Sequence, residues 1–557
     1  MRRWAGWFVG GLAVGVLAGA GTYAGAGSLA DSPEHLGGGD RPAAVARFVE
    51  QTAESGIRQV YDGGFTFYVG GGVATFDCND DRRPDLYVAG GENEAGLFRN
   101  DSDVGGPLSF SRVADPVTDL TEVTGAYPID VDSDGILDLA VLRFGENVML
   151  RGRGECRFER ANETWGIDGD DDWTAAFSAT WQGDDSLPTL AFGNYLETEP
   201  DEQNARDCVP SALLRPDAGG SYGAATPLAP GVCALSVLFS DWNATGRADL
   251  RVANDRHYYR EGSEQLWRVE PGADPSLYTA ADGWKELSIW GMGIATADVT
   301  GDGLPEVVIT SQGDNKMQTL AEGPDGPTYD DLAIRMGTTA HRPFMGDASY
   351  PSTAWHPELA DVNNDGVLDL YLSKGNVDAQ VDHAADDPSN LMLGRPDGTF
   401  VESAREAGVV SLGLGRGASL VDLNLDGLLD LVEVNRADNV RVWRNVGAGT
   451  AEQAEPMGSW LALALEQPAP NVDAIGAWVE VRHGGTTTRR QVTLGGGHAS
   501  GHVGWVHVGL GAADSAQVRI TWPDGEVGAW LDVAADTFAL VERGATQAVP
   551  WTPPTSP

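Results

Sequence analysis

Residues 130–142 read Asp-Val-Asp-Ser-Asp-Gly-Ile-Leu-Asp-Leu-Ala-Val-Leu, and their pattern recurs along the chain. Carboxylates stand at positions 1, 3, 5 and 9 of this stretch, glycine stands at position 6, and an apolar run follows. Oxygen ligands at alternate positions of one loop can surround a cation that takes roughly six to eight oxygens, which suits Ca²⁺ better than Mg²⁺. The stretch therefore predicts a calcium-binding turn that leads into a β-strand.

Five further segments keep this spacing of carboxylate, amide and hydroxyl side chains. Glycine follows position 5 in five of the six copies, whereas Arg82 stands there in the first copy, where we expect a weaker or distorted site. Asp-rich turns between strands explain one or two copies but not a spacing that is kept six times. The sequence therefore predicts up to six structural Ca²⁺ ions. The predicted ligands are Asp77, Asn79, Asp81, Asp85, Asp130, Asp132, Asp134, Asp138, Asp241, Asn243, Thr245, Asp249, Asp298, Thr300, Asp302, Glu306, Asp361, Asn363, Asp365, Asp369, Asp422, Asn424, Asp426 and Asp430.

An EF-hand is the alternative reading of the last copy, because Glu433 completes the EF-hand loop pattern there. The other five copies carry an apolar residue where that motif requires glutamate. Each copy also continues into a short β-branched or aromatic run, such as residues 370–372, which is typical of a strand rather than of a helix. We therefore interpret the EF-hand match as accidental.

A seventh, decayed copy lies between the second and third full copies. It puts Trp181, Gly183, Asp185 and Thr189 in the four ligand positions, so we expect no metal there. The seven copies start at 77, 130, 181, 241, 298, 361 and 422, which places them 51 to 63 residues apart. Repeats of this length indicate solenoids, propellers or arrays. Each interval holds four short strands, so the prediction is a seven-bladed β-propeller, with a linear β-solenoid as the alternative.

The rest of the chain divides by composition. Residues 456–545 contain short apolar or alternating runs separated by Gly, Pro and Asp, which predict a small β-sandwich or barrel-like domain. The expected fold class is thus all-β: a seven-bladed β-propeller with calcium-binding loops at 45–455, plus this C-terminal domain. Residues 1–30 are predicted as a signal peptide or N-terminal membrane anchor, 31–44 as a linker and 546–557 as a Pro-rich tail.

The repeats resemble the FG-GAP or VCBS type of integrin α-subunit propellers, and residues 456–545 resemble the ASPIC/UnbV domain of the cartilage acidic protein-like family. The resemblance implies that the calcium loops gather on one face of the propeller and leave the opposite face to partners. The C-terminal residues that carry it are Asn471, Ile475, Gly476, Ala477, Gly495, Gly496, Gly497, His507, Val508, Gly509, Leu510, Gly511, Trp522, Pro523, Asp524 and Gly525.

The N-terminus has the pattern of an export signal. Arg2 and Arg3 are followed by an uncharged run from Trp4 to Ala30 that ends in small residues. If it is not cleaved, this run is long enough to span a bilayer. Both readings place the folded body outside the cytoplasm, as a secreted, periplasmic or cell-surface protein whose contact with a membrane is limited to this anchor.

The four cysteines fit disulfides in an oxidising compartment, although four cysteines allow three connectivities. Cys208 and Cys233 enclose a loop within one repeat, so we pair them first, which leaves Cys78 with Cys156.

Charge and motifs limit the function. With 82 acidic and 37 basic residues the chain has a net charge of −45, which disfavours nucleic acid as a partner. It contains no P-loop, His-Glu-x-x-His motif or dinucleotide fingerprint. His498, His502 and His507 lie in Gly-rich β sequence and are interpreted as ordinary histidines rather than a transition-metal site. We expect a binding, adhesion or scaffold module for an unknown protein or glycan partner and no enzyme; the alternatives are an extracellular hydrolase or a secondary-metabolite tailoring protein.

Overall fold

The computed structural model describes residues 44–183, 185–198, 206–217, 219–255, 262–339, 352–377 and 387–554. The chain divides into two units, Met1–Asp40 and Arg41–Pro557, and everything described below belongs to the second. The predicted signal peptide or anchor at 1–30 therefore lies outside the described residues. A search of the described residues for a helix long and apolar enough to cross a membrane finds none.

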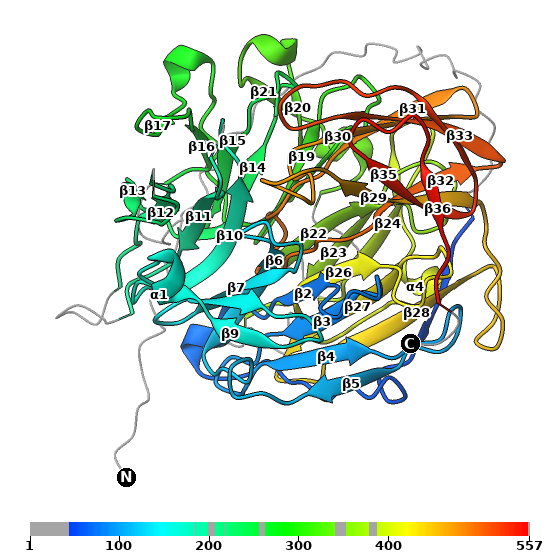
Figure 1. Ribbon diagram of the computed structural model, residues 1–557, viewed down its shortest axis with the longest axis horizontal. Helices are drawn as coiled ribbons and strands as arrows, with labels where there is room; N and C mark the ends of the chain where they lie inside the picture. The colour runs from blue at the N-terminus through cyan, green and yellow to red at the C-terminus, as the bar shows by residue number, and fades with distance from the viewer. Residues whose placement is uncertain are drawn as a thin grey trace, which may run out of the picture. The chain divides into compact units, whose positions relative to one another are not determined.

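Seven four-stranded sheets come from the repeat region (Figure 1). In six of them the four strands follow one another in chain order, and in the seventh β1 pairs with β28, so the order is β1-β28-β27-β26. The sheets consist of β2 (Val73–Phe76), β3 (Asp85–Val88), β4 (Gly96–Asn100) and β5 (Phe110–Val113); β6 (Val123–Ile129), β7 (Asp138–Arg143), β8 (Val148–Gly152) and β9 (Phe158–Arg160); β10 (Thr174–Thr180), β11 (Thr189–Asn194), β12 (Ser211–Leu214) and β13 (Thr226–Leu228); β14 (Ala234–Ser240), β15 (Asp249–Asn254), β16 (Gln265–Arg268) and β17 (Ser276–Leu277); β18 (Gly291–Ala297), β19 (Glu306–Ser311), β20 (Lys316–Leu320) and β21 (Tyr329–Asp331); β22 (Ala354–Ala360), β23 (Asp369–Lys374), β24 (Asn390–Gly394) and β25 (Phe400–Glu402); and β1 (Arg47–Glu50), β28 (Arg441–Gly447), β27 (Asp430–Arg436) and β26 (Leu414–Val421).

The first strand of each sheet lies innermost. Strands β2, β6, β10 and β14 are buried along their whole length. Each first strand contacts the first strand of the next sheet, and β26 contacts β2. In Figure 1 the blue strand β2 accordingly lies beside the yellow strand β26. The fold is all-β, with propeller-like four-stranded sheets.

The helices among the described residues are single turns that connect strands. Four of them end at a glycine with positive φ, Gly166, Gly283, Gly337 and Gly408, which is a conformation that glycine adopts at little cost. The helices are α1 (Asn162–Trp165), α2 (Ala333–Met336), α4 (Ala404–Ala407) and the 3-10 turns η1 (Phe65–Tyr68), η2 (Ala280–Asp282) and η3 (Gly323–Asp325).

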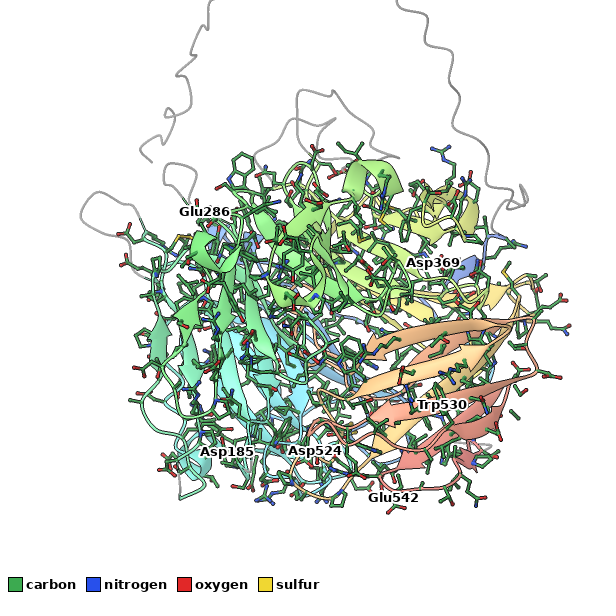
Figure 2. All side chains as sticks on the ribbon, turned by 90° about the horizontal axis from the view of Figure 1, so that it is seen from above. Asp185, Glu286, Asp369, Asp524, Trp530 and Glu542 are labelled. Carbon is green, nitrogen blue, oxygen red and sulfur yellow. A yellow bond between two sulfur atoms is a disulfide. The ribbon has the colours of Figure 1, made fainter. Side chains whose placement is uncertain are left out.

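The C-terminal domain consists of two further four-stranded sheets around one core. Burial alternates along β33, so that Ala516, Val518 and Ile520 face the core. In Figure 2, Trp530 and Glu542 mark this domain, and Asp369 marks β23 of the repeat sheets. The sheets have the order β32-β29-β35-β36 and β31-β30-β33-β34 and consist of β29 (Ser459–Glu466), β30 (Trp478–His483), β31 (Thr486–Gln491), β32 (Val506–Gly511), β33 (Ser515–Thr521), β34 (Leu531–Ala534), β35 (Thr537–Glu542) and β36 (Val549–Trp551).

Residues 494–503, here named the central segment, connect β31 to β32 and contact the first strand, or the residues just before it, in all seven repeat sheets. The segment fits because it is rich in glycine: Gly495, Gly496 and Gly497 all have positive φ. Its partners are also small, since a Cβ added at Gly72 would lie 1.7 Å from Ala499 O. The contacts are Gly70 N–H to His498 Nε2, Val73 N–H to Ser500 Oγ, Ala126 N–H to Ala499 O, Ser178 Oγ–H to Leu494 O, Gly496 N–H to Val237 O, Gly497 N–H to Ile294 O, His498 N–H to His356 Nδ1, and the close approach of Ser500 Oγ to Gly417.

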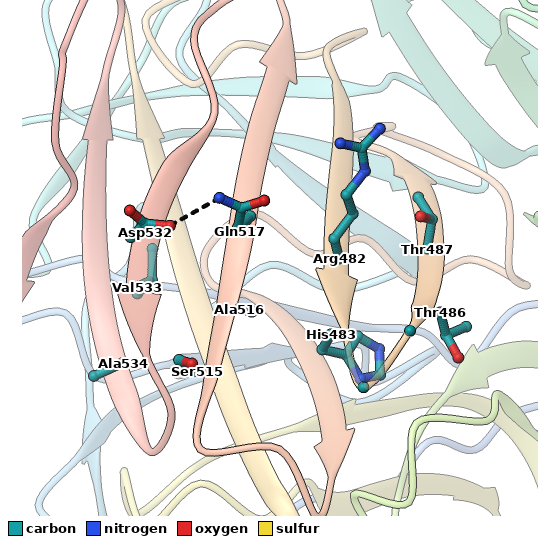
Figure 3. Close-up of a pocket in the computed structure, with 12 residues that line it drawn as sticks. Arg482, His483, Thr486, Thr487, Ser515, Ala516, Gln517, Asp532, Val533 and Ala534 are labelled. Carbon is teal, nitrogen blue, oxygen red and sulfur yellow. Dashed lines mark hydrogen bonds between the residues drawn. The ribbon is translucent and has the colours of Figure 1, made fainter.

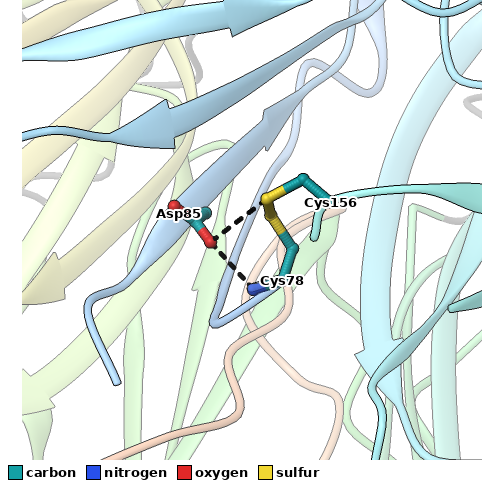
Figure 4. A group of neighbouring side chains, drawn as sticks. All are labelled: Cys78, Asp85 and Cys156. Atoms are coloured by element: carbon teal, nitrogen blue, oxygen red, sulfur yellow. Dashed lines mark hydrogen bonds between the residues drawn. A yellow bond between two sulfur atoms is a disulfide. The ribbon is translucent and has the colours of Figure 1, made fainter. Parts of the chain in front are cut away.

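Both disulfides form with the predicted pairing. Cys78 bonds to Cys156 and thereby joins the first two repeat sheets, and Cys208 bonds to Cys233. Asp85 lies beside the first disulfide, where its carboxylate accepts a hydrogen bond of 2.8 Å from the Cys78 backbone N–H (Figure 4). Crosslinks of this kind stabilise a chain chiefly by restricting its unfolded state.

Candidate metal-binding loops

Six loops join the first and second strands of their sheets: 77–85, 130–138, 241–249, 298–306, 361–369 and 422–430. All six share one internal hydrogen bond. The position-1 aspartate accepts the backbone N–H of position 6 at 2.6 to 3.0 Å. The glycines at that position have φ between 83° and 89°. The structure therefore places all predicted position-1 residues in equivalent turns.

In the first loop the same turn forms although Arg82 takes the place of glycine at position 6. Its φ is 61°, and its N–H donates to Asp77 at 2.6 Å. A left-handed conformation costs a non-glycine residue about 1 kcal/mol. The backbone turn that we expected to be distorted is thus retained. The Arg82 side chain instead makes an ion pair of 2.7 Å with Glu466 of the C-terminal domain.

The position-9 carboxylates connect the loop to the third strand of the sheet. Asp138 accepts hydrogen bonds of 2.8 Å from the N–H groups of Val131 in the loop and of Gly152 in β8. Asp369 does the same with Val362 and Gly394. Position 9 therefore has a structural role in the sheet in addition to its role as a candidate ligand.

Three of the position-3 side chains have a buried oxygen that no group of the protein satisfies. Asn79 Oδ1, Asp132 Oδ1 and Asn424 Oδ1 are buried and have no hydrogen-bond partner. A buried polar atom without a partner costs roughly 1–3 kcal/mol, so such atoms are rare in folded proteins. In loop 130–138 the oxygens of Asp130, Asp132 and Asp138 lie within 4.8 Å of one another. Oxygen donors gathered in this way fit a hard dication such as Ca²⁺.

Burial also raises the pKa values of these carboxyl groups. The pKa of Asp130 rises to about 6 and that of Asp138 to about 8, mainly through desolvation, with neighbouring carboxylates adding to the shift. Burial likewise raises the pKa of Asp361, Asp422 and Asp430. Without a cation, the ionised form of each group is therefore disfavoured.

Arginines partly compensate the charge of four loops. Arg151 Nη2 lies 2.7 Å from Asp132 Oδ2 and 2.8 Å from Asp134 Oδ2. The described carboxylates of loops 298–306 and 361–369 form no ion pair. In these two loops no arginine therefore offsets the charge of the carboxylates. The other arginine contacts are Arg83 with Asp81, Arg247 with Asp249 and Arg444 with Asp426.

Two loops depart from the pattern at a threonine. Thr245 Oγ1 donates to Asn243 Oδ1 at 2.8 Å, and Thr300 Oγ1 donates to Glu306 Oε1 at 3.1 Å. In the decayed seventh copy, Gln182 Oε1 accepts hydrogen bonds from Thr189 Oγ1 and Arg215 Nε instead. Loops 241–249 and 298–306 therefore offer fewer free oxygens than the other four.

The EF-hand alternative is wrong. Glu433 lies on strand β27, where an EF-hand requires a helix. Its Oε2 accepts a hydrogen bond of 2.6 Å from the Tyr371 hydroxyl and another of 3.2 Å from Ser373 Oγ. A second cluster, of Asp85 with Cys78 and Cys156, offers no thiolate because both sulfurs belong to the disulfide of Figure 4.

The three C-terminal histidines have separate partners. His498 Nε2 accepts the Gly70 N–H at 3.1 Å, His502 Nδ1 lies 2.7 Å from Thr75 Oγ1, and His507 Nε2 lies 3.2 Å from Gly427 O. Gly70 and Thr75 lie just before and within β2, and Gly427 lies in the loop between β26 and β27. The histidines therefore contribute to packing, in line with their interpretation from sequence.

The C-terminal domain lies on the candidate loops, which sequence reasoning missed. Contacts reach all six loops, and most of them use backbone atoms of the loop. The contacts are Trp505 Nε1–H to Arg82 O, Asn471 N–H to Ser133 Oγ, Trp478 Nε1–H to Asp241 Oδ2, Arg489 Nη1–H to Gly303 O, Gly511 N–H to Asn364 O, and His507 Nε2–H to Gly427 O.

The sheets and the loops together define an all-β repeat protein with propeller-like four-stranded sheets. Residues 77–141 match the family model described as FG-GAP-like repeat, and residues 467–548 match the one described as ASPIC and UnbV. The chain is thus an FG-GAP-like repeat protein with a C-terminal ASPIC/UnbV domain, as the resemblance implied. A comparison with curated proteins finds no match.

Several solved structures are similar at low identity. One is a lectin of Agrocybe aegerita that recognises non-reducing terminal N-acetylglucosamine, at 15% identity over 67% of this chain and 93% of that chain, with a TM-score of 0.36. Another is YCF48 from Cyanidioschyzon merolae, at 10% identity over 72% and 99%, with a TM-score of 0.40. A third is BBS1N in complex with ARL6DN, at 11% identity over 74% and 99%, with a TM-score of 0.42. Likenesses this low carry no argument about function.

Proposed function

We propose that the protein is a secreted or surface-anchored, calcium-binding β-propeller that acts as a binding or scaffold module for a protein or glycan partner. The repeat sheets form a closed ring of seven blades. This part of the proposal is supported by the seven sheets of the repeat region and by the contact of β26 with β2. The two disulfides favour an oxidising compartment outside the cytoplasm.

The observation that carries the calcium proposal is the set of buried position-3 oxygens without a partner, at Asn79, Asp132 and Asn424. Bound Ca²⁺ would supply the positive charge that the clustered carboxylates lack. Side chains at positions 1, 3, 5 and 9 of each loop would hold the ion. Calcium is structural in this proposal, because each loop joins two strands of one sheet and also contacts the C-terminal domain.

The test compares the thermal unfolding of metal-free protein, of protein with about 1 mM Ca²⁺ and of protein with about 1 mM Mg²⁺, a concentration in the range of extracellular calcium modules. A ligand that binds only the folded state raises its stability, and several bound ions add their effects. We expect calcium to raise the Tm by many degrees and magnesium to raise it far less. Equal Tm values in all three samples would contradict the proposal.

A further inference from the structure

A cleft of about 1090 Å³ lies between the repeat sheets and the C-terminal domain. Its walls include residues 298–301, residues 365–368, the turn at 394–400, the hairpin of β30 and β31, and β32. A shallower pocket of about 600 Å³ on the C-terminal domain alone lies between that hairpin and the ends of β33 and β34, and His483 borders both cavities (Figure 3). Small-molecule sites have volumes of about 300–1000 Å³, so the larger cleft has room for several sugar units.

Four arginines line this cleft in a chain whose net charge is −45. Among the residues that the structure describes, Arg335 and Arg395 make no side-chain hydrogen bond or ion pair with protein, whereas the Arg490 guanidinium interacts electrostatically with the Glu358 carboxylate. Arg489 donates to Gly303 O through Nη1, and its buried Nε has no partner. Guanidinium groups bind carboxylates in a bidentate manner, so unpaired arginines beside a cleft indicate an anionic ligand.

His483 adds a buried hydrogen-bond acceptor to the cleft. Its exposed fraction is 8%, and its Nδ1 lies 3.2 Å from Leu510 O. A carbonyl oxygen accepts only, so Nδ1 carries the proton and Nε2 is an acceptor, which has no partner in the protein. The ring lies against loop 361–369, where a Cβ added at Gly366 would be 3.0 Å from Cε1. A ligand hydroxyl would satisfy Nε2.

The remaining lining is rich in hydroxyl groups and oxygen acceptors. Thr486, Thr487 and Thr488 of β31 also line the cleft. The acidic lining residues are Asp298, Asp361, Asp365 and Asp397, and the first three belong to the two candidate calcium loops in which no arginine compensates the charge. Cations bound in both loops would offset these three carboxylates and leave the arginines as the excess charge of the lining.

From this arrangement we propose that the cleft binds an acidic oligosaccharide with carboxylate-bearing sugar units. The sugar carboxylates pair with Arg395 and Arg490, and a ring hydroxyl donates to His483 Nε2. A uronic acid carries a carboxylate and several hydroxyls on one rigid ring, which matches this combination of groups. The inference rests on the scaffold function proposed above and names the chemical class of its partner.

The test is calorimetric titration of the full chain in about 1 mM Ca²⁺ with oligogalacturonate, oligomannuronate and hyaluronan oligosaccharides. The fully methyl-esterified oligogalacturonate is the neutral match, and a poly-glutamate peptide of equal charge is the peptide control. We expect at least one acidic saccharide to bind at least tenfold more tightly than the ester and the peptide. Binding of none of the three, equal binding of acid and ester, or preferential binding of the peptide would overturn the proposal.

Variants locate the binding in the cleft. Arg395→Gln and Arg490→Gln should each weaken saccharide binding about tenfold, whereas Arg157→Gln, an exposed arginine on the second repeat sheet, should leave it unchanged. Arg395 is partly exposed, so its variant keeps the test valid if Arg490→Gln fails to fold. A calcium-dependent Tm without saccharide binding would overturn this inference alone. A Tm that does not depend on calcium would overturn the proposed function itself.

Discussion

Asp302 is the residue at which the role of a single ligand can be separated from its role in folding. It is exposed, and its Oδ1 accepts the Leu304 N–H at 2.9 Å, a contact that the asparagine oxygen can keep. Asp302→Asn should therefore lower the calcium stoichiometry by about one ion. The Tm of the metal-free protein should hardly change, and the Tm in calcium should fall.

The matched control is Asp185→Asn in the decayed seventh copy, where the aspartate is also exposed. Ion counting by mass spectrometry of the desalted proteins and Tm measurements in both conditions check the prediction. Loss of one ion in both variants, or in neither, would contradict the assignment of Asp302 as a ligand.

Arg151 is expected to compete with a cation for loop 130–138. Its guanidinium lies within 2.8 Å of both Asp132 and Asp134. An exposed ion pair is worth roughly 0.2–1 kcal/mol, and Arg151 makes two. Arg151→Gln should therefore strengthen calcium binding at this loop about threefold to tenfold, as measured by calorimetric titration. An unchanged or weaker affinity would show that the guanidinium does not compete with calcium at this loop.

At the scale of the element, the stabilisation of each loop by calcium should depend on pH. Burial raises the pKa of Asp130 to about 6 and that of Asp138 to about 8, from an ordinary value near 4. Folding therefore tightens proton binding to these groups, and the stability that this contributes is present below pH ~4 and is lost as the pH rises through about 6 and 8. Metal-free protein should accordingly have a lower Tm at pH 8 than at pH 5.

Calcium replaces these protons, so its stabilising effect should grow across the same pH interval. Scans of metal-free and calcium-loaded protein at pH 5, 6, 7 and 8 measure this difference. If calcium raised the Tm by the same amount at every pH, protons and calcium would not compete for the carboxylates of the loops.

The central segment is an element whose glycines can be tested against a matched control. Gly497 has φ +56°, and a Cβ there would lie 2.4 Å from the His356 ring. Gly183 has φ +57° and no atom near its Cβ position. Both alanine variants carry the same backbone cost, so the difference between them reports the steric contact alone.

Overpacking in a core costs about 1–3 kcal/mol. Gly497→Ala should therefore lower the free energy of unfolding by about that amount more than Gly183→Ala does, as measured by urea denaturation. Equal losses in the two variants would show that the central segment does not pack tightly in solution.

At the scale of the whole molecule, the repeat sheets and the C-terminal domain should unfold together. The central segment contacts all seven repeat sheets, and the C-terminal domain contacts all six candidate loops. Calorimetry should therefore show one transition whose calorimetric and van't Hoff enthalpies agree. Two separate transitions would mean that the contacts between the two parts are weak.

The sequence predicted the local structure well and the assembly poorly. The spacing in loops such as 130–138 predicted the turns and the strands that follow them, because these depend on side chains close in sequence. The disulfide pairing followed instead from the position of Cys208 and Cys233 within one repeat, which left Cys78 with Cys156. The position of the C-terminal domain depends on loop backbone atoms such as Gly303 O and Gly427 O, which any residue could supply. Only the glycine run at 495–497 indicated a close approach of two segments. The sequence alone does not show that the segments it approaches are the first strands of the repeat sheets.

The central segment also restricts how this chain can change its length. Leu494, Gly496, Gly497 and His498 contact the third, fourth, fifth and sixth repeat sheets in turn, each through a hydrogen bond. One inserted or deleted residue would shift every later contact to the wrong sheet. Outer turns of the repeat sheets that do not touch this segment or the cleft have no such constraint, so related chains should tolerate insertions there while conserving the number of residues between β31 and β32.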